Sequence, residues 1–330
     1  MERITIFMPL QLTAAADDDG RRLDRILRKA LGKLPLSAIH RLLRKGEVLV
    51  DGKSATADYR IKSGQIITLN LSEPLLGFKS PSPKTSPSPA LEILYEGEGL
   101  LILNKPAGLI VHGRDSLEEL VRSYLKEKLP PSLSFRPGPL HRLDRPSTGL
   151  IAFSTSLEGA RSFSAMMRMQ KIKRQYLALV QGIIEKAETW YDELVRDDGR
   201  MKTFARPPTG SETKTAITYV TPILGNEAST LILAEIETGR THQIRAQAGS
   251  RGHPLLGDVK YGARPIGFFE DSFLLHAWRL EFPPPLPRLI EAPLPEKFQK
   301  KISELFGADK VFGADKVFGA DSRYIYGRVQ

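Results

Sequence analysis

One short stretch of the chain places an acid among bases in a pattern that could do chemistry. It reads His141-Arg142-Leu143-Asp144-Arg145-Pro146-Ser147-Thr148-Gly149-Leu150. Small turn-forming residues follow Asp144, and the apolar run from Leu150 to Phe153 predicts a buried strand directly after the turn. A carboxylate held in such a turn can be directed at a ligand and act as a nucleophile. An isolated aspartate of this kind is more often paired with a neighbouring arginine, so a functional interpretation depends on the rest of the chain.

Other segments support a functional interpretation. With His-Arg-Leu-Asp and the Ser/Thr-Gly pair after it, the stretch resembles the catalytic loop of the RluA family of pseudouridine synthases, which isomerise uridine within structured RNA. Further blocks resemble the family and follow in the same order. They are Asn104 to Gly108, Arg174 to Val180, Lys214 to Thr218, Thr238 to Arg245, Gly252 to Pro254, Gly257-Asp258 with Tyr261-Gly262, and Leu274 to Ala277.

The resemblance implies three catalytic residues. Asp144 matches the family's nucleophile, and Arg245 matches the cation that pairs with it and keeps it ionised in a desolvated pocket. Tyr176 matches the residue that stacks on the uracil and is a candidate for removing the proton from carbon five. The reaction is an isomerisation, so we expect no cofactor and no metal. Attack on the sugar, addition to the base and glycal formation all stay open as routes.

The resemblance also suggests contacts with RNA. A uracil in a stem must be flipped out of the stack, and Arg142 matches the residue that fills the space it leaves. Arg240 and Lys105 are expected to hold phosphates, which position RNA without specifying its sequence. We further expect His141 and Leu275 to contact the substrate.

Composition narrows the class of partner. The chain has 330 residues and a net charge of +10, which favours a polyanionic partner, either nucleic acid or an anionic membrane surface. No apolar run is long enough to span a bilayer, so structured RNA, ribosomal or possibly transfer RNA, is the better prediction. The absence of cysteine excludes disulfides and thiolate chemistry. We expect a cytoplasmic monomer that needs no protein partner.

Most of the net positive charge lies in a small N-terminal module. Residues 1–20 are expected to form a first strand or an extended arm. Residues 21–72 contain a first amphipathic helix, a second with Ser37 as its N-cap and Gly46 at its end, and a hairpin. Between Arg21 and Lys62 there are twelve lysines and arginines but only four acids. The module resembles the RNA-binding module of ribosomal small-subunit protein four, and its expected phosphate contacts are Arg22, Arg41, Arg44 and Lys45.

The remaining chain divides into three parts. Residues 73–90 are rich in serine and proline and predict a mobile linker. Strands and helices alternate irregularly over 91–305, which predicts an α+β catalytic domain. The resemblance implies the pseudouridine synthase fold, with a long mixed, mainly antiparallel sheet and a central active-site cleft. Residues 306–330 repeat a six-residue unit and are expected to be a disordered tail.

Three other functions would fit parts of this sequence. A non-catalytic RNA-binding or ribosome-associated factor would have no need of Asp144, Tyr176 and Arg245 together. An RNA methyltransferase would be expected to carry a glycine-rich cofactor loop, and no Gly-x-Gly-x-x-Gly occurs. A glycosidase would need a second acid paired with Asp144, and no spacing marks one. The family's usual Thr-Ser-Gly is replaced by Ser147-Thr148-Gly149, a departure that bears on substrate choice more than on activity.

Overall fold

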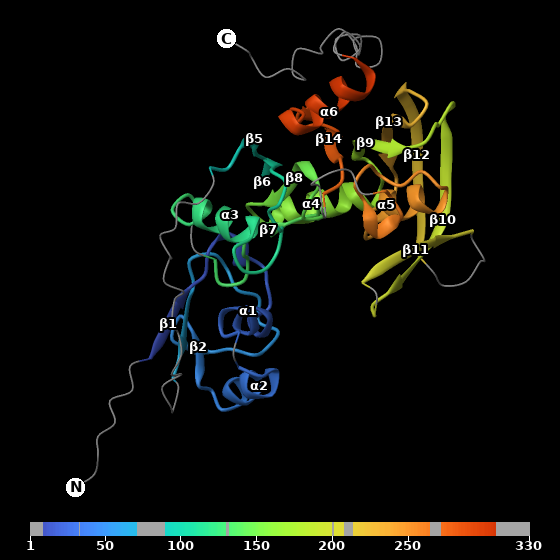
Figure 1. Cartoon of the computed structure of the whole chain (residues 1–330). Coiled ribbons are helices and arrows are strands. Elements are labelled where there is room, and N and C mark those ends of the chain that lie inside the picture. Colours follow the sequence, from blue (N-terminus) through green and yellow to red (C-terminus); the bar gives the residue numbers. More distant parts are fainter. Residues whose placement is uncertain are drawn as a thin grey trace, which may run out of the picture. The chain divides into compact units, whose positions relative to one another are not determined.

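The protein divides into two compact units in the computed structural model, which describes residues 9–32, 34–70, 90–129, 132–199, 201–207, 214–264 and 272–307 (Figure 1). The first unit contains the described residues up to Ala90 together with 121–138 and 154–160. The second contains 91–120, 139–153 and the described residues from Arg161 onward. The serine- and proline-rich linker, apart from Ala90, and the repeat tail from Ala308 onward lie outside the described residues.

The first unit is a four-stranded antiparallel sheet with two helices. The strand order is β1-β4-β2-β3. The bounds are β1 Leu10–Thr13, α1 Leu23–Ala30, α2 Leu36–Arg44, β2 Val48–Val50, β3 Lys53–Ser54 and β4 Ile66–Leu69. Residues 10–13 thus join the sheet of the basic module as a strand. Both helices bury the apolar face that their spacing predicted, including Leu23, Ile26 and Ile39. The N-cap of α2 is Pro35, so the prediction of Ser37 as the cap was wrong.

Part of the chain that was assigned to the catalytic domain packs into this first unit. Asp18 is fully buried, and its carboxylate accepts hydrogen bonds of 3.0 Å from the backbone N–H groups of Leu133 and Ser134. Such bonds offset the cost of burying a carboxylate and tie the segment after α3 to the N-terminal module.

The second unit is built on an eleven-stranded mixed sheet. Its path is β11-β10-β12-β13-β9-β14-β8-β6-β5, with β15 beside β14 and β7 beside β8. Strands β8 and β14 run parallel, whereas β9 is antiparallel to both β13 and β14. The bounds are β5 Ile93–Gly97, β6 Leu100–Lys105, β7 Gly138–Pro139, β8 Thr148–Ser154, β9 Lys173–Gln181, β10 Glu188–Asp197, β11 Lys202–Arg206, β12 Lys214–Gly225, β13 Ser229–Ile236, β14 Leu275–Glu281 and β15 Leu289–Glu291.

Four further helices follow in the described part of the chain, and two of them, α5 and α6, pack on this sheet at separate places. Their bounds are α3 Leu117–Leu125, α4 Leu157–Arg168, α5 Gln243–Ser250 and α6 Glu296–Phe306. Helix α5 lies against β10 and β11 (Figure 1). Helix α6 buries Phe298 and Ile302 in a cluster with Leu177 of β9 and Trp278 of β14. Strands β9 and β14 are therefore held in the middle of the sheet, where the motif residues at their ends gain fixed positions.

Candidate active site

The turn that carries Asp144 is fixed by buried contacts on its backbone. It lies between β7 and β8, and the seven residues of β8 are all buried, as the apolar run predicted. Lys105 at the end of β6 is fully buried and donates hydrogen bonds to the backbone carbonyls of Pro106, Arg145 and Ser147 at 2.8, 3.2 and 2.7 Å. Burial lowers the pKa of Lys105 to about 8, against the opposing effect of the Asp144 charge. The expected phosphate contact by Lys105 does not fit this environment, because its ammonium group is occupied inside the protein.

A glycine allows the turn to enter the sheet. Gly149 has φ +99°, and a Cβ at this position would lie 2.2 Å from the carbonyl oxygen of Ala277 in β14. Glycine is therefore required both by the backbone angle and by the close approach of the parallel strand. Next to it, Thr148 Oγ1 lies 2.8 Å from Nδ1 of the fully buried His276.

Asp144 and Arg245 meet, as the resemblance implied. Arg245 Nη1 donates to Asp144 Oδ2 at 2.8 Å across 101 residues of sequence. The other side of the guanidinium donates from Nε and Nη2 to Asp258 at 2.7 and 2.9 Å. Burial lowers the pKa of Arg245, but the hydrogen bonds and charges of Asp258 and Asp144 outweigh it and leave that pKa above its ordinary value. Arg245 therefore stays charged and is oriented by Asp258.

Aromatic residues hold this guanidinium in place. It lies 4.9 Å from the ring centre of Tyr261 and 4.1 Å from that of Phe273. Cation–π contacts of this kind favour arginine over lysine, whose ammonium cannot also make the two-pronged bond to a carboxylate.

His242 approaches Asp144 from the start of α5. Its Nε2 lies 3.6 Å from Asp144 Oδ1, and its Nδ1 lies 2.9 Å from the hydroxyl of Tyr261. That hydroxyl also accepts a bond from the N–H of Thr203, so His242 is linked through Tyr261 to β11. Burial lowers the pKa of His242, an effect that Asp144 opposes and Arg245 reinforces. The imidazole is therefore neutral at pH 7 and helps to orient the carboxylate.

Two cavities open on either side of Asp144. The larger, of about 540 Å³, is lined among others by Asp144, Tyr176, Arg240 and Leu275. The smaller, of about 400 Å³, includes Lys260 and His112, and Arg142, Asp144, His242 and Arg245 line both. The carboxylate is thus accessible from a space large enough for a nucleotide, with basic residues along its walls.

The other predicted site residues of this unit have distinct environments. Tyr176, in β9, is 8% exposed, and burial raises the pKa of its phenol above the ordinary value. Leu275 is also buried on the cavity wall. Arg142 is exposed, and so is Arg240, whose Nε donates to the carbonyl of Thr215 at 3.1 Å.

His141 has a structural partner that the sequence did not reveal. Its Nε2 accepts a hydrogen bond of 3.0 Å from the N–H of Ala152 in β8, and its ring stacks on Phe163. Burial, aided by the charge of Arg174, lowers the pKa of His141 to about 4. A neutral ring at the wall of the cavity can contact a base but does not supply a charge for a phosphate.

The predicted contacts in the basic module lie in the first unit. Arg41 and Arg44 of α2 and the adjoining Lys45 are exposed. Lys45 lies 3.9 Å from the carboxylate of Glu47. Arg22 precedes α1 and makes bonds of 2.9 and 3.1 Å with Asp24, so part of its charge is neutralised. Arg41 and Arg44 therefore have the most accessible charges among these four residues.

Sequence reasoning quoted the segments that contain His242, Asp258, Tyr261 and Arg174 but assigned these residues no role. Their contacts reach Asp144, Thr203 and Glu237, which are distant in the chain, so spacing alone did not reveal them. The one available signal was the presence of polar residues inside motif blocks that otherwise fit buried segments.

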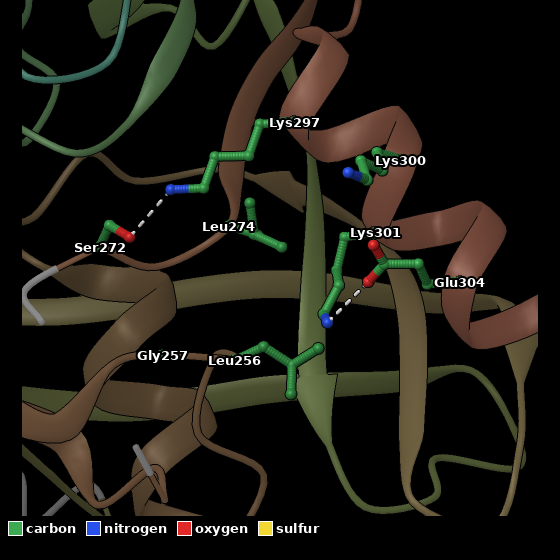
Figure 2. Close-up of a pocket in the computed structure, with 8 residues that line it drawn as sticks. All are labelled: Leu256, Gly257, Ser272, Leu274, Lys297, Lys300, Lys301 and Glu304. Carbon is green, nitrogen blue, oxygen red and sulfur yellow. Dashed lines mark hydrogen bonds and ion pairs between the residues drawn. The ribbon is translucent and has the colours of Figure 1, made fainter. Parts of the chain in front are cut away.

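A further cavity lies beside α6 and contains no comparable arrangement (Figure 2). Three lysines of α6 line it, with Lys297 bonded to Ser272 at 3.3 Å and Lys301 paired with Glu304 at 2.9 Å. Among its described lining residues, no carboxylate is held by a buried cation as Asp144 is. The arrangement around Asp144 is therefore the candidate active site.

Comparisons with known proteins agree with this geometry. Residues 99–250 match the family model described as RNA pseudouridylate synthase, and residues 21–67 match the S4 domain. The chain is 31% identical to ribosomal large subunit pseudouridine synthase C of Vibrio parahaemolyticus over 86% of this chain and 93% of the relative. It is 32% identical to ribosomal large subunit pseudouridine synthase D of Nitrosomonas europaea, over 87% and 85% respectively.

Solved structures show the same fold. Human RNA Pseudouridylate Synthase Domain Containing 4 superimposes with a TM-score of 0.55 and 22% identity, over 65% of this chain and 92% of that one. The second unit therefore has the pseudouridine synthase fold, and the first has an S4 domain. The chain belongs to the RNA pseudouridine synthase family, isomerases that convert uridine to pseudouridine in RNA.

Proposed function

We propose that the protein isomerises specific uridines in structured RNA of the large ribosomal subunit, with Asp144 as the nucleophile. The observation that carries the proposal is the ion pair between Asp144 and the doubly anchored Arg245, open to a cavity that Tyr176 also lines. The buried cation fixes the direction of the carboxylate, as nucleophilic attack requires. The ribosomal substrate rests on the names of the relatives, and transfer RNA is the second candidate.

Base flipping would bring the uracil to Asp144. The two cavities meet at Arg142 and Asp144, so a nucleotide drawn out of its helix could enter there while the exposed Arg142 fills the space that it leaves. The flat ring of Tyr176 would stack on the base, a contact typically worth ~1 to 3 kcal/mol. The raised pKa of the phenol keeps it protonated at neutral pH, which favours stacking over removal of the proton from carbon five.

The S4 domain would supply affinity that does not depend on sequence. Arg41 and Arg44 are exposed on one helix and can neutralise phosphates. Replacing both with glutamine should reduce the slope of log affinity against log salt by roughly 0.7 per lost contact. An unchanged slope would place the RNA elsewhere. We infer a monomer without a protein partner, because every named residue of the proposed site comes from this one chain. We propose the cytoplasm as its location, in keeping with relatives named for the large ribosomal subunit.

The experiment that tests the catalytic proposal measures tritium release from ribosomal RNA and transfer RNA labelled at carbon five of uracil. The wild type should release tritium and Asp144→Asn should release none. Asp198→Asn removes a carboxylate of the same unit that is 85% exposed and paired with Arg196, and it should retain activity. Release by Asp144→Asn at the wild-type rate would refute the nucleophile. Tight binding of both RNAs by the wild type without release would favour a binding protein.

A further inference from the structure

A second buried arginine lines the larger cavity and has no carboxylate partner among the described residues. Arg174, in β9 two residues before Tyr176, is 7% exposed. Its Nη2 donates to the backbone carbonyl of Glu237 at 2.8 Å, while its buried Nε has no hydrogen-bond partner. The carboxylate of Glu237 is engaged elsewhere, by Gln170 and Tyr219. A buried cation without a counter-ion is costly, so its presence on a cavity wall calls for a ligand.

The position of the guanidinium is set by the cavity wall. Its Nη1 lies beside Gly239, only 2.8 Å from where a Cβ of that residue would be. Arg174, Gly239, Tyr176 and Asp144 all line this cavity, and the charges of Arg174 and Asp144 both act on the Tyr176 phenol. A base stacked on Tyr176 would therefore lie within reach of the carboxylate and of this second cation.

Arg245 and Arg174 differ in whether carboxylates balance their positive charge. Arg245 is shared by Asp144 and Asp258, so that group of three carries a net negative charge. Its positive charge is already committed to the two carboxylates. Arg174 retains a positive charge that no described carboxylate balances, and it is available to a negative charge that develops on the substrate.

The isomerisation creates such a charge. When the bond between ribose carbon one and uracil N1 breaks, its electron pair stays on the base and spreads over the two carbonyl oxygens. The base then turns, carbon five bonds to ribose carbon one, the proton of carbon five leaves, and N1 takes up a proton. If Asp144 instead adds to the base first, the electron pair again moves onto the uracil carbonyl system. Each route therefore places negative charge on the base.

We propose that Arg174 is a further catalytic residue, whose Nη1 donates to a uracil carbonyl and stabilises the negative charge on the detached base. The inference rests on the proposed function and assigns the residue that faces the leaving group. A preorganised donor of this kind in a site that excludes water typically contributes on the order of 100-fold or more to the rate.

The test compares single-turnover rates of uridine conversion and of 5-fluorouridine conversion in RNA, with products identified by mass spectrometry after nuclease digestion. Carbon five of 5-fluorouridine carries no hydrogen that could leave, so its rearranged product keeps the fluorine and takes up water at carbon six. Arg174→Gln should lower the rate on uridine by roughly 100-fold at saturating enzyme. With 5-fluorouridine the deficit should shrink clearly, because fluorine itself stabilises the anion. Lys173→Gln removes a charge from the preceding residue, which is 58% exposed and lies near Glu281, and should leave both rates unchanged.

A second variant distinguishes a loss of catalysis from a loss of folded protein. Gly239→Ala keeps the arginine but places a methyl group against Nη1, so it should show the same substrate-dependent deficit in a smaller degree. Equal deficits on both substrates, or a wild-type rate for Arg174→Gln, would overturn the inference. A wild type that isomerises neither RNA would refute the proposed function instead.

Discussion

Lowering the pH is expected to destabilise the second unit through His276. This histidine is fully buried in β14, with Nε2 donating to the carbonyl of Ala292 at 3.2 Å and Nδ1 accepting from the hydroxyl of Thr148 at 2.8 Å. Both ring nitrogens are thus hydrogen-bonded in the neutral form. Burial lowers the pKa of His276 from 6.5 to about 4, against the raising effect of the bond to Ala292.

The sign of the effect follows from proton binding. Between pH 6.5 and pH 4 the unfolded chain binds a proton at this position and the folded protein does not, so stability is lost as the pH falls through this window. At pH 5 the loss covers about 1.5 pH units at about 1.4 kcal/mol each. The free energy of unfolding should therefore fall by about 2 kcal/mol between pH 8 and pH 5 from this group alone.

Urea unfolding followed by tryptophan fluorescence measures this effect in the right unit, because both tryptophans of the chain, Trp190 and Trp278, lie in the second unit. His276→Gln should be less stable at pH 8 but should lose about 2 kcal/mol less than the wild type on going to pH 5. Ile151→Val, a core change without a titrating group, should keep the full drop. Parallel pH profiles for the wild type and His276→Gln would refute the reasoning.

Three further predictions concern the turn and its anchors. Asp258→Asn should lower the single-turnover rate on the order of 100-fold by misplacing Arg245, as measured by rapid-quench kinetics. It should also cost about 3 kcal/mol of stability in urea unfolding, because the buried Arg245 keeps only one of its two carboxylate partners. Lys105→Met should lower turnover while leaving unchanged the slope of log RNA affinity against log salt concentration. A reduced slope in a binding titration would show that Lys105 contacts a phosphate. Gly149→Ala should destabilise the second unit by about 3 kcal/mol or more in urea, through the forced contact with Ala277 and the left-handed backbone, and wild-type stability would contradict the observed approach of the strands.

The sequence predicted those features that depend on local pattern. Helices α1 and α2 appeared from apolar spacing, and β8 from its continuous apolar run. Strands β10 and β11 were not predicted, because Glu188–Asp197 is rich in charged and polar residues and takes its strand form from pairing with β12 and β11. The pairing of non-local strands is set by tertiary contacts, which a single sequence does not display.

Some roles of individual site residues followed from the sequence, and others depend on contacts that only the folded chain makes. The meeting of Asp144 and Arg245 followed from motif resemblance and is present in the structure. The role of Lys105 was misjudged, because a lysine in a basic protein suggests a phosphate contact until its burial is known. The importance of Asp258 depends on a bond to Arg245 that only the folded chain shows.

The Arg245 guanidinium is divided between two carboxylates, and this division bears on the reactivity of Asp144, the proposed nucleophile. A carboxylate that received all three hydrogen bonds of a buried arginine would be stabilised as an anion but would give up its electron pairs to that cation. Here Asp258 takes two of the bonds and Asp144 one. Asp258 offsets most of the desolvation cost of the arginine, while Asp144 receives a single bond from it and keeps lone pairs available to the cavity. Asp258 is therefore as much a part of the environment of the proposed nucleophile as Arg245, which joins the two carboxylates.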